Sequence, residues 1–174
     1  MKALVVFESM WGNTATVAQA IAGGLGESME VSVTDVASAP PDPGGEFDLI
    51  VAGGPTHAFS MSRPSTRADA HSRGASYGDE AVGLREWLDR LPTPTHRQAI
   101  ATFDTRVKTK FPLPGSAAKS AARAAHRHGY DRAAHAESFS VGDIDGPLLD
   151  GELERATAWA RELAAKVESA PTAG

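Results

Sequence analysis

The sequence predicts an α/β protein built on an open parallel sheet. Short apolar runs alternate with amphipathic helical patterns along the chain, in the order β-α-β-β-α-β-α-β-α. Three of the predicted strands lead directly into polar segments. Strands separated by helices need crossover connections, which are right-handed and make the strands parallel. A length of 174 residues predicts one domain, large enough to bury a full core.

The first two elements have the clearest patterns. Residues 3–7 are an uninterrupted apolar run and predict a buried strand. Residues 13–25 predict a helix, because Val17, Ile21 and Leu25 recur every four residues on one face. Three glycines at the end of this segment favour a helix stop.

The remaining elements follow from similar patterns. Four further strands are predicted at residues 30–35, 47–52, 98–103 and 136–141. Three further helices are predicted at residues 79–91, 116–128 and 151–167. Residues 60–80 are polar and Arg-rich without a clear period, which predicts a long loop. The domain is expected to cover residues 1–168, with a frayed tail at 169–174.

Composition excludes several classes of function. The chain has no cysteine, so disulfides, thiolate metal sites and iron–sulfur clusters are excluded. A net charge of −5 argues against nucleic-acid binding by bulk electrostatics. No apolar run approaches the ~20 residues of a membrane span, and the N-terminal segment lacks the flanks of a signal peptide. We therefore expect a cytoplasmic protein with no membrane insertion.

The turn between the first strand and the first helix predicts an anion site. The first N–H groups of a helix have no intrahelical partner, and the helix dipole favours negative charge there. Ser9, Asn13 and Thr14 add polar side chains, and Gly12 allows close backbone approach. The alternative is an ordinary capped turn that binds no ligand.

Three polar segments together resemble the flavodoxin family. Residues 9–14, Ser-Met-Trp-Gly-Asn-Thr, are similar to its phosphate loop. Residues 53–59 correspond to the loop that covers one face of the flavin, and residues 104–106 to the loop on the other face. The resemblance covers roughly the whole chain. It implies a five-stranded parallel sheet of order 2-1-3-4-5 with helices on both faces, and it implies flavin mononucleotide (FMN) as cofactor.

The resemblance also assigns site residues. It implies that the phosphate is held by Ser9, Met10, Trp11, Gly12, Asn13 and Thr14. It implies that the flavin ring is bordered on one side by Pro55, Thr56, His57 and Phe59, and on the other side by Thr105 and Arg106. No catalytic side chain and no metal ligand is expected, since the flavin would carry the redox chemistry.

Physical reasoning agrees with a phosphate group. Residues 9–14 contain no Lys or Arg, and neutral donors at a helix end suit a phosphate dianion. The triphosphate-binding pattern GxxxxGK[ST] is absent from the sequence.

Two departures from the family bear on function. Trp11 is bulky for its position, and it either borders the cofactor or packs against residues 60–80. Six cations follow the second and third segments: Arg63, Arg67, Arg73, Arg106, Lys108 and Lys110. They form either a positive rim that attracts anionic ligands or a solvated loop surface.

Three functions remain open from the sequence. One is an electron carrier that docks to a redox partner protein. The second is an NAD(P)H-dependent reductase of quinone-type acceptors. The third is a binding module that keeps the fold without the flavin.

Overall fold

The computed structural model describes residues 1–111 and 113–169. The elements, in chain order, are β1 (Lys2–Phe7), α1 (Asn13–Leu25), β2 (Glu30–Asp35), the 3₁₀ turn η1 (Gly44–Glu46), β3 (Leu49–His57), β4 (Ser60–Met61), α2 (Pro64–Ser72), α3 (Leu84–Arg90), β5 (Ala99–Val107), α4 (Ala117–Arg127), β6 (Asp131–Arg132), β7 (Glu137–Val141) and α5 (Glu152–Ser169).

The sheet has the predicted parallel core. β2, β1, β3 and β5 lie side by side, and β6 and β7 both pair with β5 at the edge. β6 pairs with the start of β5 and β7 with its end, so together they act as one interrupted edge strand. The predicted order 2-1-3-4-5 is confirmed by β2-β1-β3-β5-β7. The additions are β6 and the two-residue β4, which pairs antiparallel with the end of β3.

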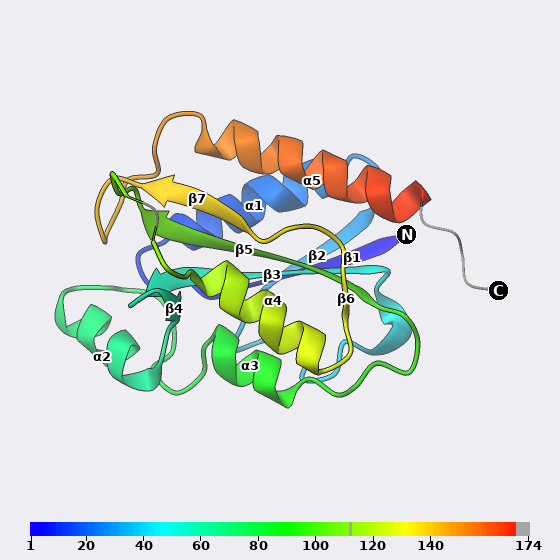
Figure 1. The fold of residues 1–174 in the computed structure, drawn as a ribbon, viewed down its shortest axis with the longest axis horizontal. Helices are drawn as coiled ribbons and strands as arrows, with labels where there is room; N and C mark the ends of the chain where they lie inside the picture. Colours follow the sequence, from blue (N-terminus) through cyan, green and yellow to red (C-terminus); the bar gives the residue numbers. More distant parts are fainter. Residues whose placement is uncertain (112, 170–174) are drawn as a thin grey trace.

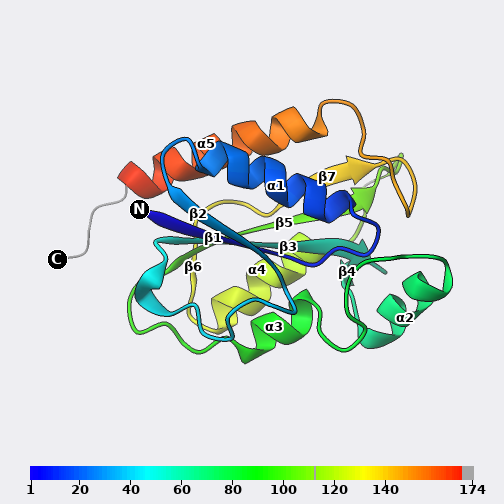
Figure 2. The same cartoon turned by 180° about the vertical axis from the view of Figure 1, so that it is seen from behind.

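Helices cover both faces of the sheet. α1 and α5 lie on one face and α3 and α4 on the other (Figure 1), and the view from behind shows the same layers (Figure 2). One apolar cluster fills the space beneath α1 and α5, and a second fills the space beneath α3 and α4. α2 stands apart, beside β4 at the end of the sheet toward which the parallel strands run.

α1 and α5 approach each other closely at Gly24. A Cβ atom at this position would lie 2.5 Å from the Thr157 carbonyl oxygen and 2.8 Å from the Ala160 Cβ atom. The Thr157 hydroxyl also donates to the carbonyl oxygen of Ala20. Gly24 is therefore needed for close helix packing, a role that the predicted helix stop did not anticipate.

The segment predicted as a long loop at 60–80 contains a helix. Pro64 starts α2, and the Thr66 hydroxyl accepts a hydrogen bond of 2.9 Å from the Arg63 backbone N–H. The loop prediction was wrong because the inward position of this helix is occupied by Arg67, whose side chain is 0% exposed. A buried charge gives no hydrophobic period. α3 is also shorter than predicted, since it begins at Leu84.

Two segments expected to be loops are strand ends. Gly53 to His57 belong to β3, and residues 104–106 belong to β5. Gly53 marks close packing here, because an added Cβ would lie 2.3 Å from the ring of Phe103 on the neighbouring strand. Gly53 therefore indicates close contact between strands rather than a turn.

The last helix is longer than predicted. α5 continues to Ser169, so the first residue of the expected tail is helical, and residues 170–174 lie outside the described residues. Among the helices that the structure describes, none is both long enough and apolar enough to cross a membrane.

Candidate functional site

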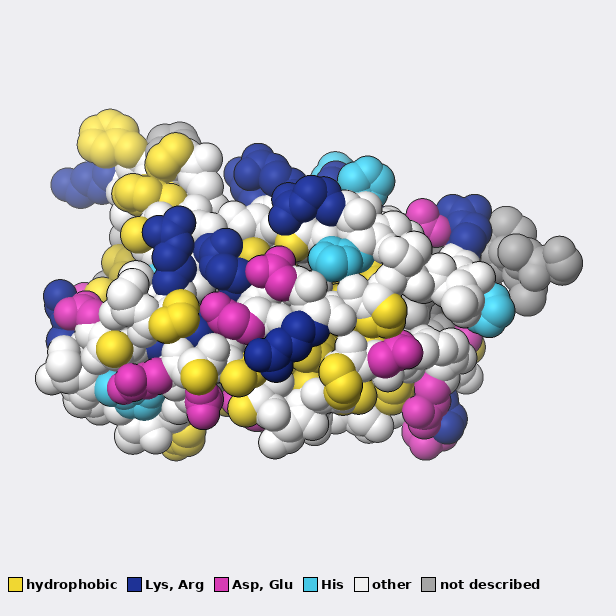
Figure 3. Space-filling view, turned by 90° about the horizontal axis from the view of Figure 1, so that it is seen from below, with side chains coloured by type: hydrophobic (Ala, Val, Ile, Leu, Met, Phe, Trp, Pro, Cys, Tyr) yellow, Lys and Arg dark blue, Asp and Glu magenta, His cyan; other side chains and the backbone are white. Residues whose placement is uncertain are grey.

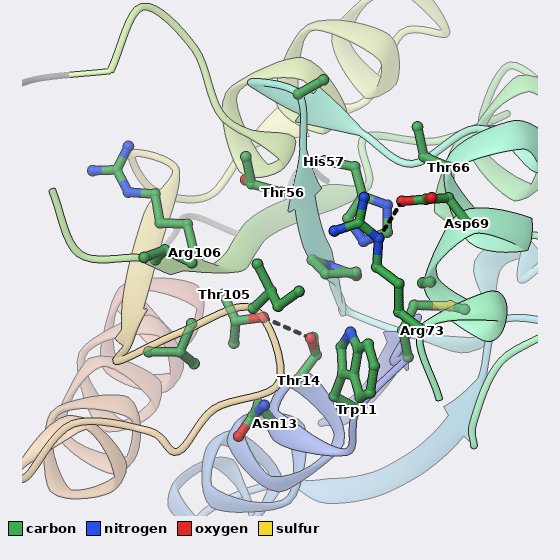
Figure 4. Close-up of a pocket in the computed structure, with 17 residues that line it drawn as sticks. Trp11, Asn13, Thr14, Thr56, His57, Thr66, Asp69, Arg73, Thr105 and Arg106 are labelled. Carbon is green, nitrogen blue, oxygen red and sulfur yellow. Dashed lines mark hydrogen bonds and ion pairs between the residues drawn. The ribbon is translucent and has the colours of Figure 1, made fainter. Parts of the chain in front are cut away.

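A cavity of about 330 Å³ opens at the carboxyl ends of the central strands. This is within the range of about 300–1,000 Å³ that small-molecule sites occupy. Its walls come from the β1–α1 turn, the end of β3, α2, the end of β5 and the segment around β7 (Figure 4). The lining residues are Met10, Trp11, Asn13, Thr14, Pro55, Thr56, His57, Ala58, Thr66, Asp69, Ala70, Arg73, Thr105, Arg106, Val107, Val141 and Ile144.

α1 and α4 both begin at this edge of the sheet, and their N-termini differ. In α4, the N–H of Ala117 donates to the Thr56 hydroxyl at 2.8 Å, and the N–H of Ala118 donates to the buried Asp104 carboxylate at 2.8 Å. The Ser116 hydroxyl accepts from the N–H of Lys119. α1 is preceded by Gly12, has no side-chain cap from the described residues and has no acid in its first turn. Its first N–H groups are therefore left for an anion.

The β1–α1 turn is held in shape by its own residues. The Gly12 N–H donates to the Ser9 hydroxyl at 3.1 Å, and Gly12 adopts a left-handed conformation with φ of 89°. The Tyr77 ring lies against Gly12, 3.4 Å from where a Cβ would stand, and the Tyr77 N–H donates to the Met10 carbonyl oxygen. Ser9 and Gly12 thus shape the turn without lining the cavity.

Hydrogen bonds tie this turn to two distant segments. The hydroxyl groups of Thr14 and Thr105 lie 2.7 Å apart, and both side chains are buried. The Asn13 amide donates to the backbone carbonyl oxygen of Asp145 at 3.0 Å. The first helix, the end of β5 and the loop after β7 are therefore joined at the cavity floor, as Figure 4 shows for the two threonines.

Trp11 lines the cavity and also packs against residues 60–80, as one of the two predictions for it expected. It contacts a small apolar cluster formed by Met10, Ala70 and Ala75. His57 lies on the opposite side of the cavity, on β3. Burial lowers the pKa of His57 below its ordinary value, and the charge of Arg67 lowers it further. Both effects favour the neutral form of the His57 imidazole.

The six predicted cations do not form one rim. Arg73 pairs with Asp69 at 2.9 Å at the cavity mouth, and Arg106 lines the cavity. Arg67 points away into a buried polar network: it donates to the Ser62 hydroxyl at 2.8 Å and lies 3.0 Å from the Glu86 carboxylate. Arg63, Lys108 and Lys110 are exposed outside this cavity.

Glu8 completes the buried network directly before the turn. Its Oε2 atom accepts the Leu84 N–H at 2.7 Å, while Oε1 has no hydrogen-bond partner among the described residues. Burial raises the pKa of Glu8, against the opposing effects of the Ser62 hydroxyl, the Leu84 N–H and the charge of Arg67. The network fixes α2 and the start of α3 behind the cavity.

The phenylalanines near the site do not face the cavity. Phe103 is fully buried and packs edge-to-face against Phe139. Phe59 lies at a hairpin tip with φ of 65°, and Phe111 lies on the segment after β5; both are exposed. Trp11 and His57 are thus the ring-bearing side chains that line the cavity.

No protein-family model matches the chain, and no curated protein sequence matches it. Solved structures do match. A flavodoxin from the domain Archaea is 20% identical with a TM-score of 0.67, covering 97% of this chain and 99% of that one. Flavodoxin 2 from Bacillus cereus is 17% identical with a TM-score of 0.62, covering 95% and 99%. A WrbA-like flavodoxin from Agrobacterium tumefaciens is 18% identical with a TM-score of 0.60, covering 96% and 97%.

The chain has the flavodoxin-like fold.

Most residues that the sequence predicted for the site of this fold lie together. All of them line the cavity except Ser9, Gly12 and Phe59. Sequence reasoning missed the α2 wall, formed by Thr66, Asp69, Ala70 and Arg73. It also missed the residues Ala58, Val107, Val141 and Ile144. α2 was missed because it has no hydrophobic period, since its inward residue is the charged Arg67.

Proposed function

We propose that the protein binds FMN in this cavity and transfers electrons at the flavin. The observation that carries the proposal is the uncapped N-terminus of α1, which opens onto a cavity of suitable size in a flavodoxin-like fold. α4 begins at the same edge and its first N–H groups are bonded to side chains, whereas no side chain of the described residues caps α1.

The residues present fit a phosphate at this end of the cavity. The backbone N–H groups of the first turn of α1 and the Thr14 hydroxyl are neutral donors, as a phosphate dianion requires. Thr105 lies 2.7 Å from Thr14 and orients that hydroxyl. Trp11 and His57 would border the ring from two sides of the cavity. Bound FMN would supply hydride or single-electron transfer, which the protein groups around it tune.

A second candidate is an NAD(P)H-dependent reductase of quinone-type acceptors. It is favoured by Arg106, which lines the cavity and forms no ion pair within the described part of the chain. A free cation beside the cofactor attracts an anionic nicotinamide nucleotide. Anaerobic addition of NADPH or NADH to the flavin-loaded protein separates the candidates: a reductase bleaches the flavin without a partner, whereas a carrier does not.

The test of FMN binding is an equilibrium titration followed by flavin fluorescence and visible absorption. We expect FMN to bind at least tenfold more tightly than riboflavin, because charge-assisted hydrogen bonds contribute about 1.5–3 kcal/mol each. Thr14→Val removes a donor from the phosphate end and should weaken FMN binding by about tenfold or more while changing riboflavin binding little.

Thr16→Val is the matched control. Thr16 lies one half-turn further along α1, is exposed, and donates to the Gly12 carbonyl oxygen at 3.0 Å. The same substitution there should leave the preference for FMN intact. A folded protein that retains no flavin would overturn the proposal and favour a flavin-free binding module.

A further inference from the structure

Charge is sharply divided along this chain. Residues 105–130 contain six Lys and Arg residues and no Asp or Glu. The whole chain has 17 Lys and Arg against 22 Asp and Glu, so the remaining residues carry 11 cations against 22 acids. An acidic protein thus has one continuous segment of opposite sign, and that segment runs from the cavity along α4.

The six cations lie on one exposed surface. Three lie at and just after the end of β5, and three lie along the solvent side of α4. With Phe111 we call this set the basic surface: Arg106, Lys108, Lys110, Phe111, Lys119, Arg123 and Arg127. Figure 3 views the face covered by α3 and α4, where Lys and Arg side chains gather in the upper half. Every ion pair among the described residues uses other cations.

The basic surface is continuous with the cavity. A second hollow of about 240 Å³ is lined by Lys108, Lys110 and Phe111, and it shares Arg106 and Val107 with the cavity. A molecule that covers these cations therefore also reaches the mouth of the candidate flavin site.

Exposed apolar side chains surround the same mouth. Phe111 is 79% exposed, and Phe59, Tyr77 and Ile144 are each more than half exposed. All four lie on segments at the end of the sheet where the cavity opens. Aromatic residues surrounded by polar and charged residues are typical of protein–protein interfaces.

We propose that the basic surface docks a protein that carries an acidic patch, and that this contact brings the partner to the cavity mouth. Arg106, Lys108 and Lys110 steer the approach next to the cavity, Lys119, Arg123 and Arg127 extend the contact along α4, and Phe111 supplies the apolar contact. That the partner exchanges electrons rests on the proposed function; the docking itself does not.

A compact acidic patch suits this surface better than a long polyanion. Outside residues 105–130 the chain has twice as many acids as cations, and the loop after β7 adds the exposed Asp143 and Asp145 beside the mouth. A nucleic acid or an anionic bilayer extends beyond the cations and meets these acids. A protein patch of similar size meets the cations alone and also offers apolar atoms to Phe111.

The test uses an acidic plant-type [2Fe–2S] ferredoxin as the probe and amide chemical shifts of the ¹⁵N-labelled protein as the readout. At about 10 mM ionic strength, where the Debye length is about 30 Å, we expect shifts at residues 105–127 and none on the exposed face of α5. The binding should be lost at about 1 M salt, where the Debye length is about 3 Å.

Matched charge reversals separate the basic surface from net charge. Lys119→Glu with Arg123→Glu should weaken ferredoxin binding by at least about tenfold, because like charges then face each other. Lys2→Glu with Lys166→Glu makes the same change in net charge at residues outside the basic surface and should alter binding less than about twofold. Neither pair lines the cavity, so FMN binding should be unchanged in both.

Several results would overturn the proposal: no ferredoxin binding at low salt, equal losses in the two double variants, or shifts centred on α1 and α5. Tighter binding to a DNA duplex or to phosphatidylserine vesicles than to ferredoxin would also overturn it, in favour of a polyanion or a membrane. The titration is repeated with and without FMN. If ferredoxin shifts the amide signals of a protein that binds no flavin, the proposed FMN function is wrong but the proposed docking surface is supported.

Discussion

Replacing Arg67 by Met should destabilise the protein strongly. The Arg67 side chain is 0% exposed; it lies 3.0 Å from the Glu86 carboxylate and donates to the Ser62 hydroxyl at 2.8 Å and to the Glu80 carbonyl oxygen at 2.9 Å. Met fills similar volume but leaves these acceptors and Glu8 buried without a cation. Breaking a buried ion pair in this way costs about 3–5 kcal/mol, a large part of the ~5–15 kcal/mol that stabilises a typical domain.

The assay is urea unfolding followed by circular dichroism, with Arg73→Met as the matched control. Arg73 follows the same helix and pairs with Asp69, but both side chains are more than half exposed. Its loss should cost no more than about 1 kcal/mol. Equal losses for Arg67→Met and Arg73→Met would refute the idea that the buried network holds α2 in place.

A second variant tests the role of Glu8 in the same network. Burial already raises the pKa of Glu8, and loss of Arg67 raises it further. Adding Glu8→Gln to Arg67→Met should therefore restore stability, and it should restore more at pH 8 than at pH 5, because a larger fraction of the carboxylate is charged at the higher pH. A rescue that is larger at pH 5 would show that the sign of this coupling is wrong.

Two further predictions concern packing and protonation. Gly53→Ala should lower the free energy of unfolding by about 1–3 kcal/mol, because its Cβ would overlap the Phe103 ring. Gly23→Ala should raise the free energy of unfolding, because Gly23 faces open space on α1. Urea unfolding measures both, and a Gly53→Ala variant as stable as the parent protein would contradict the packing argument. The pKa of His57 is lowered by burial, so its imidazole should titrate below pH 6.5 in a proton NMR titration, and its contribution to stability should be present above that pH and be lost as the pH falls. His57→Gln should flatten this acid loss, and a midpoint above 6.5 would contradict it.

The fold was predictable because its main elements carry simple periods. β1 and α1 follow an apolar run and an i, i+4 pattern, and the structure places both within a residue of the prediction. The strand order required the resemblance as well, since periodicity alone does not order a sheet. The two-residue β4 and β6 are too short to leave a pattern.

The site was predictable at the ends of β1, β3 and β5 but not on α2. Turn residues such as Asn13 and Thr14 can be recognised by their residue type and by their position at the start of a helix. The α2 wall depends on Arg67, a buried cation that pairs with Glu86 on the next helix, α3. Such pairing is a property of the folded chain, and no local pattern encodes it.

The close contact of α1 with α5 sets the time at which the site can form during synthesis. Gly24 packs against the backbone of α5, and Asn13 bonds to the backbone at residue 145. α1 can pack on β1, β2 and β3 early in synthesis, but a ribosome has made nearly all of the described chain before α1 meets α5. The turn that is translated first therefore reaches its final shape late, and until then the side of α1 that packs against α5 is left for chaperones to cover.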